Sequence, residues 1–481
     1  MPDTGGTFVI SGCCNSAAAS DEPSALESSL DQLPVVVIGA GPVGLAAAAH
    51  LAERGMNYLL LEAGAQVGAS IAQWGHVRTF SPWRYNIDPA ARRLLDTRGW
   101  SSPDSDWLPT GAEIIEHYLS PLAAHPAIAP RLRLGTKVTD ISRVGHDRVR
   151  TAGRELSPFV VRLAGGDEVL GRAIIDATGT WHSPNVLGAS GLPAYGEAEA
   201  SELIDHALPD VLGADRDHYV GRHTLVIGAG HSAATTLLAL GRLAEQFPHT
   251  QVTWAIRAGS AARSYGGGAK DALPARGQLG TRLEELVRSG VIALRTGFFT
   301  HSLIRDTDSV AVIGRDLSGA EQKIIADRIV AATGYRPDHS ITTELRLDLD
   351  PILGGPRALA PLIDPNVHSC GTVPAHGAAE LAHPEPDHYT VGVKSYGRAP
   401  TFLMATGYEQ VRSVVAALDG DWQAAREVQL ELPDTGVCSS DLAEAQESRV
   451  GLATGISGGL LGTPLAMADS EAADPDGCSC G

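Results

Sequence analysis

Residues 34–61 show a simple order of apolar and polar positions. An apolar run at 34–38 is followed by a glycine-rich turn at 39–44, an alanine-rich stretch to about Arg54 and a second apolar run at 58–61. Short continuous apolar runs are typical of parallel strands buried on both faces, and an alanine-rich stretch favours a helix. The pattern predicts a strand, a turn, a helix and a second strand.

The same order recurs later in the chain. An apolar run at 223–227 leads into a glycine-rich turn at 228–233, a helical stretch to about Gln246 and another apolar run at 251–256. Parallel strands joined by a helix need a crossover of this length. We therefore expect two separate strand–turn–helix–strand units.

Two further apolar runs end in the same three residues. Residues 173–180 and 328–335 each lead an apolar strand into Ala-Thr-Gly. A glycine at a strand end lets the backbone pass close to a ligand, although it also suits an ordinary turn. Because both copies occur beside the two units, we interpret them as parts of two ligand sites.

The glycines of the first turn have separate roles in a unit of this kind. Gly39 makes the tight turn, Gly41 lets a pyrophosphate touch the backbone, and Gly44 allows the helix to pack on the strand. The pyrophosphate then rests on the helix N-terminus. Glu62 ends the second strand, where its carboxylate can accept hydrogen bonds from ribose hydroxyls. These features predict a dinucleotide site.

The second turn differs at two positions. Ala233 replaces the third glycine, a form that still permits close helix packing. Arg257 follows the next strand, where the first unit has Glu62. A carboxylate repels a 2′-phosphate, whereas a guanidinium pairs with it. We expect NADPH rather than NADH at this site, with Arg263 either as a second phosphate partner or as a solvated side chain.

The segment 69–83 mixes aromatic residues with Arg78. If the first dinucleotide is FAD, Trp74 or Trp83 could stack on its flavin ring, or both could pack in the core. Arg78 and Ser81 are the candidates for contacts at the flavin edge. No residue is assigned as an acid or base, because hydride transfer between two cofactors needs neither.

The predicted cofactor-binding residues form one set. They are Gly39, Gly41, Pro42, Gly44, Glu62, Trp74, Arg78, Val138, Thr178, Gly179, Gly228, Gly230, Ser232, Ala233, Arg257, Arg263, Thr333 and Gly334.

Composition narrows the class of partner. The chain has 481 residues and a formal net charge of -19, which argues against a nucleic-acid partner because such binding needs clustered Lys and Arg. No apolar run reaches the roughly 18 residues of a membrane-spanning helix. The first basic residue is Arg54, so the N-terminus lacks the positive region of a secretory signal. We expect a cytoplasmic protein without a membrane partner.

The two ends of the chain differ from the middle. Residues 1–33 and 433–481 are rich in small and polar residues and have little apolar periodicity, so both are interpreted as tails. They contain most of the cysteines, which are either unpaired thiols or speculative thiolate ligands for a soft metal or metalloid such as trivalent arsenic. These cysteines are Cys13, Cys14, Cys438, Cys478 and Cys480.

The motifs taken together resemble the FAD- and NADPH-dependent class B flavin monooxygenases, including the flavin-containing and arsenic-operon monooxygenases. The resemblance covers roughly residues 34–430. It implies an α/β fold with two Rossmann-type, three-layer ββα dinucleotide-binding domains, in which the NADPH domain is inserted in the FAD domain. The expected division is an N-terminal tail 1–33, an FAD-binding domain at 34–215 and 336–432, an NADPH-binding domain at 216–335, and a C-terminal tail 433–481.

The resemblance also implies a reaction. NADPH would reduce FAD, the reduced flavin would react with O2, and one oxygen would pass to a small-molecule substrate with a soft nucleophile, an S, N or trivalent As atom. A role in arsenic detoxification follows from the arsenic-operon members. A homodimer is left open.

Two departures from the family pattern stand out. The FxGxxxH fingerprint is only faintly present in residues 191–195 and His206. The Gly-Asp that holds the FAD ribityl or phosphate in many such flavoproteins is missing, since residues 370–372 read Cys-Gly-Thr where it is expected. The helix that follows, from near Pro400, could direct its positive end at the flavin.

Two other functions remain open. A pyridine-nucleotide reductase of a disulfide or metal needs a redox cysteine pair beside the flavin, and none occurs between residues 15 and 437, so a tail pair would have to serve. A non-enzymatic flavin or metalloid sensor would bind FAD without NADPH turnover, which the intact second unit argues against.

Overall fold

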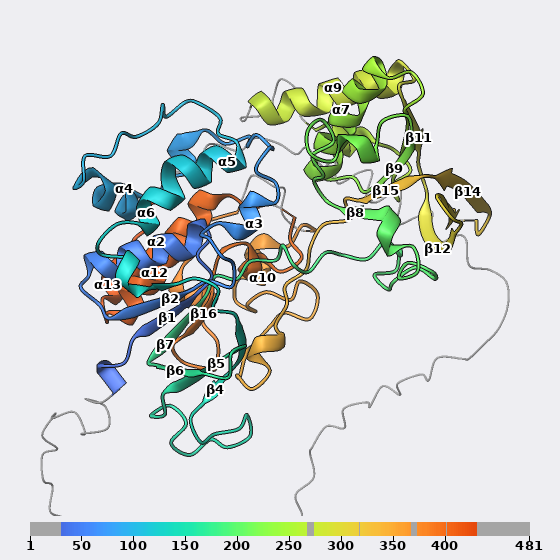
Figure 1. Cartoon of the computed structure of the whole chain (residues 1–481). Coiled ribbons are helices and arrows are strands. Elements are labelled where there is room, and N and C mark those ends of the chain that lie inside the picture. Colours follow the sequence, from blue (N-terminus) through green and yellow to red (C-terminus); the bar gives the residue numbers. More distant parts are fainter. Residues whose placement is uncertain (1–29, 267–273, 317, 367–372, 401, 431–481) are drawn as a thin grey trace, which may run out of the picture. The chain divides into compact units, whose positions relative to one another are not determined.

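The computed structural model describes residues 30–266, 274–316, 318–366, 373–400 and 402–430. It contains two five-stranded sheets of parallel strands and two three-stranded antiparallel sheets (Figure 1). The predicted fold class, α/β with two Rossmann-type units, is confirmed.

The first parallel sheet has the strand order β16-β7-β1-β2-β3. Its strands are β1 (Val35–Ile38), β2 (Tyr58–Leu61), β3 (Leu132–Arg133), β7 (Ala173–Asp176) and β16 (His388–Thr390). All four residues of β1 are buried, as expected for a central strand between two helical or sheet layers. The sheet therefore joins segments from both ends of the described chain.

Two helices pack together beside this sheet. They are α2 (Pro42–Glu53) and α12 (Met404–Leu418). Pro42 starts α2, where its missing N–H costs nothing. A Cβ on Gly407 of α12 would lie 2.6 Å from Val43 of α2, so the two helices pack too closely for a side chain there. This contact brings the return segment onto the first unit.

The second parallel sheet has the strand order β11-β10-β9-β15-β8. Its strands are β8 (Ile204–His206), β9 (His223–Ile227), β10 (Gln251–Ala255), β11 (Ile292–Arg295) and β15 (Arg328–Ala331). The helices α7 (His231–Gln246) and α9 (Pro274–Arg288) belong to this part of the chain. Strand β8 pairs with β15, although the expected boundary at residue 215 assigns it to the first domain.

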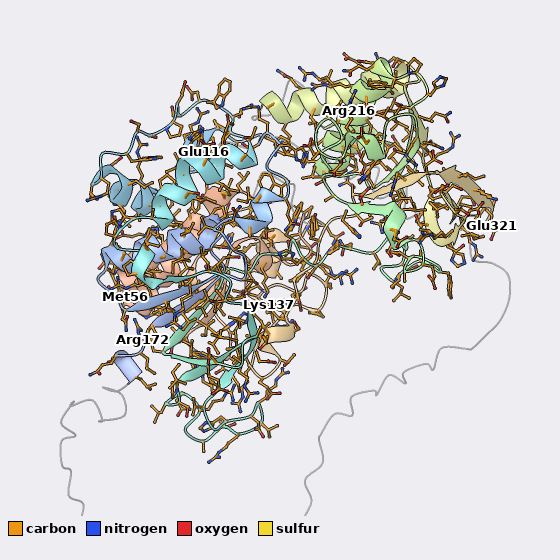
Figure 2. The ribbon with its side chains drawn as sticks, in the orientation of Figure 1. Met56, Glu116, Lys137, Arg172, Arg216 and Glu321 are labelled. Atoms are coloured by element: carbon orange, nitrogen blue, oxygen red, sulfur yellow. The ribbon has the colours of Figure 1, made fainter. Side chains whose placement is uncertain are left out.

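The antiparallel sheets are short meanders. One consists of β4 (Val138–Arg143), β5 (Phe159–Leu163) and β6 (Glu168–Gly171), and the other of β12 (Phe299–Arg305), β13 (Val310–Arg315) and β14 (Glu321–Ala326). Each meander packs on its parallel sheet through a shared apolar core. Lys137 precedes β4 and Arg172 precedes β7 (Figure 2).

The remaining helices are short. They are α3 (Ala69–Ala72), α4 (Pro89–Asp96), α5 (Gly111–Ile114), α6 (Ser120–Ala123), α8 (Ala262–Tyr265), α10 (Ala360–Ile363), α11 (Ala378–Leu381) and α13 (Trp422–Arg426). A π-helical turn, Ile115–Leu119, joins α5 to α6. Within the part of the chain that the structure describes, no helix combines the length and apolar character needed to cross a membrane.

Candidate cofactor-binding site

The first glycine loop follows β1 and is closed by the backbone of the first Ala-Thr-Gly. Gly39 has a φ of +99°, and a Cβ there would lie 2.6 Å from the carbonyl oxygen of Ala177. A Cβ on Gly44 would overlap the carbonyl oxygen of Gly39. A Cβ on Gly41, in contrast, would meet no atom within 4 Å. The loop therefore has one open position, at the glycine expected to touch the pyrophosphate.

The second glycine loop repeats this arrangement at β9. Gly228 has a φ of +136°, and a Cβ there would overlap the carbonyl oxygen of Ala332, in the second Ala-Thr-Gly. A Cβ on Gly230 would meet no atom within 4 Å. Both loops thus leave the middle glycine free for a ligand.

One backbone hydrogen bond has the same place in both units. The N–H of Ala177 donates to Ile38 at 2.9 Å, and the N–H of Ala332 donates to Ile227 at 2.9 Å. In each case the residue that follows β7 or β15 bonds to the last residue of the neighbouring central strand, β1 or β9. The two Ala-Thr-Gly segments therefore have the same position, each in contact with the first glycine of its own loop.

Glu62 closes the first loop from the other side. Its carboxylate accepts hydrogen bonds from the backbone N–H of Ala40 at 2.6 Å and of Gly64 at 2.7 Å. A carboxylate has about four acceptor sites, so two bonds leave capacity for ribose hydroxyls. The predicted position of Glu62 at the end of β2 agrees with this geometry.

The second loop is covered by the segment that carries the predicted phosphate partners. Arg257 follows β10, is exposed and donates to the carbonyl oxygen of Ala189 at 3.2 Å. Arg263 lies exposed in α8, and its neighbour Ser264 donates to the carbonyl oxygen of Ala229 in the glycine loop at 3.1 Å. Ser232 lies in the first turn of α7, half-buried. Both guanidinium groups thus belong to segment 257–264, which contacts the glycine loop through Ser264.

The two predicted flavin-edge residues already have protein partners. The Arg78 guanidinium donates to the carbonyl oxygen of Leu108, lies 3.6 Å from the Glu113 carboxylate and lies over the Trp107 ring. Hydrogen bonds from Thr110, together with the charge of Arg78, hold the pKa of Glu113 below its usual value.

The Ser81 hydroxyl donates to the Asn86 side chain at 2.8 Å, and the Asn86 amide donates back to the Ser81 carbonyl at 2.8 Å. Asn86 is fully buried. This reciprocal pair holds Ser81 in a fixed turn.

Three other predicted residues pack against the protein. Trp83 is 2% exposed and belongs to the apolar core, which is the second of the two interpretations. Trp74 is half-buried and covers Gly111, whose Cβ would lie 2.9 Å from the indole ring. Val138 begins β4 and is buried in the core between the meander and the first sheet.

The sequence-based reasoning missed a buried ion pair at the first Ala-Thr-Gly. The Lys394 ammonium donates to the Asp176 carboxylate at 2.7 Å and to the Thr178 hydroxyl at 3.0 Å. Burial opposes ionisation of Asp176, yet Lys394 and Thr178 together keep the pKa of this carboxyl below its usual value. An acid inside an apolar strand and a lysine in a later apolar segment were the available signal.

The turn that carries Lys394 directly follows the last strand of the first sheet. The last strand of the first sheet is β16, and the residues at its carboxyl end are 391–394. That end of the strand is the place that faces a nucleotide in such sheets. The expected position 370–372 lies outside the described residues. The next helix, α12, begins at Met404, four residues after Pro400.

The two segments that connect the sheets are joined by hydrogen bonds. The Thr333 hydroxyl donates to the carbonyl oxygen of Asn185 at 2.7 Å, and the Asn185 amide donates to the carbonyl oxygen of Thr333 at 3.0 Å. Trp181 stacks on Tyr335, with ring centroids 5.1 Å apart. Gly334 has a φ of +84°, which lets the strand turn away after Thr333. Thr178 and Gly179 occupy the matching place in the first unit.

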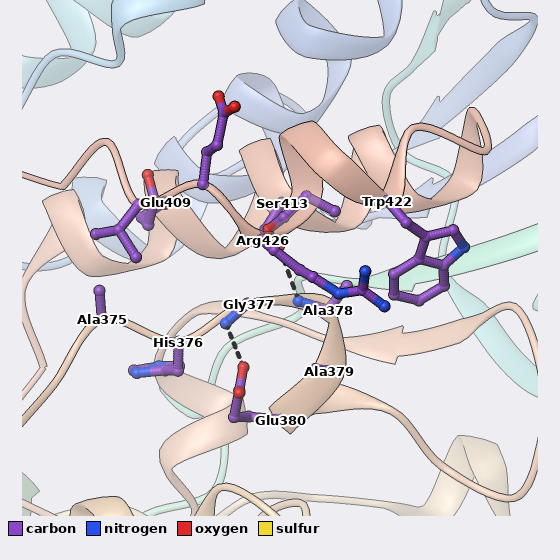
Figure 3. Close-up of a pocket in the computed structure, with 13 residues that line it drawn as sticks. Ala375, His376, Gly377, Ala378, Ala379, Glu380, Glu409, Ser413, Trp422 and Arg426 are labelled. Carbon is purple, nitrogen blue, oxygen red and sulfur yellow. Dashed lines mark hydrogen bonds between the residues drawn. The ribbon is translucent and has the colours of Figure 1, made fainter.

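A cavity of about 150 Å³ lies elsewhere, between α11, α12 and α13 (Figure 3). At its lining, the N–H of Ala378 donates to the Ser413 hydroxyl of α12, and the N–H of Gly377 donates to the Glu380 carboxylate at the start of α11. No residue of either glycine loop lines this cavity. Among the described residues, no group of three or more His, Cys, Asp and Glu side chains is arranged to hold a metal. The speculative thiolates Cys13, Cys14, Cys438, Cys478 and Cys480 lie outside the described residues.

Comparisons with known proteins agree with this geometry. The indole-3-pyruvate monooxygenase YUCCA1 of Oryza sativa subsp. japonica is 27% identical over 213 residues, which are 43% of this chain and 45% of that protein. The chain thus matches less than half the length of this curated relative. Among solved structures, the bacillithiol disulfide reductase of Bacillus cereus has a TM-score of 0.58 at 19% identity, covering 82% of this chain and 99% of its own. The FAD-bound cadaverine monooxygenase DfoA of Erwinia amylovora has a TM-score of 0.57 at 15% identity, covering 85% and 99%.

A family model described as pyridine nucleotide-disulphide oxidoreductase matches residues 36–351, which include both glycine loops and both Ala-Thr-Gly segments. This match covers more than half of the chain, and the predicted cofactors, FAD and NADPH, agree with it. The resemblance to two-dinucleotide flavoproteins is thereby confirmed. The chain belongs to the pyridine nucleotide-disulphide oxidoreductase family.

Proposed function

We propose that this oxidoreductase binds FAD at the first glycine loop and NADPH at the second, and that it acts as a flavin monooxygenase on a small molecule with a soft nucleophilic atom. The observation that carries the proposal is the duplicated loop, in which both middle glycines, Gly41 and Gly230, face open space. A dinucleotide pyrophosphate needs that open approach to the backbone.

The residues present fit the two cofactors. The open positions beside α2 and α7 would receive the pyrophosphates, Glu62 would bind the FAD ribose, and Arg257 would pair with the 2′-phosphate of NADPH. When bound, the two cofactors supply hydride transfer and reaction with O2. The chain's contribution is to orient both and to exclude water, so no protein acid or base is required for the hydride step.

The substrate class is part of the proposal. The similarity to the Oryza and Erwinia monooxygenases favours oxygen transfer. The resemblance to arsenic-operon flavoproteins adds trivalent arsenic to sulfur and nitrogen as acceptor atoms, and with it a role in arsenic detoxification. We place the protein in the cytoplasm.

The proposal is tested on the FAD-loaded protein in two steps. Anaerobic mixing with NADPH should bleach the flavin absorbance, and admission of O2 should consume oxygen and release H2O2. Arsenite, a methylated trivalent arsenical or a thioether should lower the H2O2 yield per NADPH if it accepts the oxygen. If the flavin stays oxidised after anaerobic mixing with NADPH, the proposal is contradicted.

A disulfide reductase is the second candidate, favoured by the similarity to the Bacillus cereus enzyme. Cys370 is the only cysteine between residues 15 and 437, so a redox pair would have to come from the tails. NADPH-dependent reduction of an aromatic disulfide, abolished by replacing the tail cysteines with serine, would favour this reaction over oxygen transfer.

Gly41→Ala separates cofactor binding from folding. The backbone at Gly41 has a φ of −77°, which alanine adopts freely, and no atom lies within 4 Å of the added methyl group. We expect the Tm of the variant apoprotein to equal that of the wild-type apoprotein. The Kd for FAD should rise at least about tenfold, because the methyl group occupies the position of the pyrophosphate. Fluorescence titration with FAD measures this Kd.

Gly44→Ala is the contrasting variant. Its methyl group would overlap the Gly39 backbone, so this variant should lose stability as well as FAD. Wild-type FAD affinity in Gly41→Ala would show that the pyrophosphate does not lie there.

Arg257→Ala should change the preference between the two nicotinamide cofactors. Loss of one charged hydrogen-bond partner for the 2′-phosphate should raise the KM for NADPH about tenfold and leave that for NADH unchanged. Steady-state kinetics with both cofactors provide the measurement. Arg288→Ala, on the exposed face of α9, is the matched control. Equal changes for NADPH and NADH would place the 2′-phosphate elsewhere.

A further inference from the structure

The buried pair of Lys394 and Asp176 has no role in the proposed chemistry. The side chains of Lys394 and Asp176 are 2% and 0% exposed. Burying two opposite charges costs several kcal/mol of desolvation per ion, and apolar replacements of such pairs are often neutral or stabilising. Stability alone is therefore a weak reason for a charged pair at this position.

The hydrogen bonds of the pair converge on Thr178. One carboxylate oxygen of Asp176 accepts from the Thr178 backbone N–H at 3.1 Å and from its hydroxyl at 2.7 Å. The Lys394 ammonium donates to the same hydroxyl at 3.0 Å and to the other carboxylate oxygen at 2.7 Å. The Thr178 side chain, which is itself exposed, is thus fixed by two buried charged groups.

The turn that carries Lys394 is held in place by α12. The buried Gln410 side chain accepts from the N–H of Gly392 at 2.8 Å and donates to the Ser395 hydroxyl at 2.9 Å. The Ser395 hydroxyl donates to the carbonyl oxygen of Gly392 at 2.7 Å. Because hydrogen bonds hold the turn at both Gly392 and Ser395, the Lys394 ammonium has a fixed position.

Thr178 lies beside Gly39 of the first glycine loop. Ala177, the preceding residue, has its carbonyl oxygen 2.6 Å from the position of a Cβ on Gly39, and the Thr178 Cα lies 3.3 Å from it. A movement of residues 177–179 by a few tenths of an ångström would change the space that the FAD pyrophosphate and ribityl need.

We propose that Lys394 and Asp176 are positioning residues for FAD, which hold the Thr178 hydroxyl and the backbone of residues 177–179 against the first glycine loop. The pair takes the place of the missing Gly-Asp at the carboxyl end of the last strand, but acts through Thr178. The inference rests on the proposed FAD site and not on the identity of the oxidised substrate.

The test compares FAD affinities of folded apoproteins by fluorescence titration. Removal of one charge would leave the other buried and unpaired, so both are replaced together by apolar side chains, as Asp176→Leu with Lys394→Met. We expect the Kd for FAD to rise at least about tenfold in this double variant and by a similar factor in Thr178→Val. The Kd of the triple variant should lie within about threefold of that of the double variant, because all three changes disrupt the same hydrogen-bonded arrangement around Thr178. Thr178→Ser, which keeps the hydroxyl, should bind as the wild type does.

Arg162→Met with Glu168→Gln is the matched control, since it removes an exposed ion pair from the β5–β6 meander. A double variant that binds FAD within about twofold of the wild type, or losses that add in the triple variant, would overturn the inference. If the double variant does not fold, the two Thr178 variants decide the inference. Equal FAD affinity in Thr178→Val and Thr178→Ser would overturn the inference, whereas a loss of FAD affinity in the valine variant alone would support it. Failure of NADPH to reduce the wild-type flavin would overturn the proposed function, while the FAD affinities would still decide this inference.

Discussion

Glu385→Ala should destabilise the FAD-loaded protein by about 3–5 kcal/mol, because it removes the one carboxylate that pairs with both buried guanidinium groups. The Glu385 side chain is 0% exposed and bonds to Arg143 at 2.8 Å and to Arg154 at 2.7 Å. Burial opposes its ionisation, but the two arginines and the Arg346 N–H hold the pKa of Glu385 below its usual value. Urea unfolding followed by circular dichroism measures the loss.

The location of Glu385 explains the size of this effect. Arg143 ends β4 and lies over the Phe159 ring, so the ion pair fastens the β4–β5–β6 meander to the segment that returns to β16. Glu385→Gln should lose nearly as much, since both positive charges remain. Glu385→Leu combined with Arg143→Met and Arg154→Met should recover most of the stability. The control Glu321→Ala breaks an exposed pair and should cost less than about 1 kcal/mol; a similar cost at Glu385 would contradict the prediction.

The folded state should lose about 5 kcal/mol of stability between pH 6.5 and 4.5, mainly through two buried histidines. Burial lowers the pKa of His388 to about 3 and that of His383 to about 4. Unfolded histidines bind protons below about pH 6.5, whereas these two stay neutral in the fold. Their contribution is therefore complete above pH 6.5 and falls as the pH decreases.

The pH window distinguishes the histidines from the carboxylates. Asp176 and Glu385, whose pKa values are lowered, contribute stability that is complete above the range in which unfolded carboxyl groups titrate and is lost as the pH falls through and below that range. His388→Leu should reduce the slope of unfolding free energy against pH by up to about 1.4 kcal/mol per unit. Tyr389→Phe, on the same strand, removes no group that titrates in this window. An unchanged slope in His388→Leu would show that the ring is already protonated in the fold.

The His388 ring has a further structural property. Neither of its nitrogens has a hydrogen-bond partner among the described residues, although the side chain is buried. The charges of Asp176 and Glu385 favour protonation of this ring, and the charge of Lys394 opposes it. An unpaired buried imidazole is poorly solvated in either form, and burial favours the neutral one.

Local patterns made the glycine loops predictable. Gly39, Gly41 and Gly44 lie within six residues, and their roles depend on one strand, one turn and one helix. The contact of Ala177 with Gly39 was not predictable in detail, because it joins two strands that are distant in the sequence and depends on their register. The repetition of Ala-Thr-Gly nevertheless indicated that both copies belong to the sites.

The partners of individual side chains could not be predicted from the sequence. The lone charge of Arg78 suggested a flavin contact, whereas in the structure it already bonds to Leu108 and lies near Glu113. Lys394 and Asp176 are separated by more than 200 residues, so only the fold shows that they meet. Whether Trp83 stacks or packs depended on burial, which periodicity alone could not decide for a short aromatic segment.

The order of the strands has a consequence for synthesis of the chain on the ribosome. The first sheet needs β16, which ends at Thr390, whereas the second sheet is complete once β15 ends at Ala331. While the intervening residues are being translated, β7 has an unpaired edge that can recruit another strand. Nascent chains that pause in this interval would hold a finished second sheet together with an unfinished first sheet, which makes this the interval in which aggregation competes with folding.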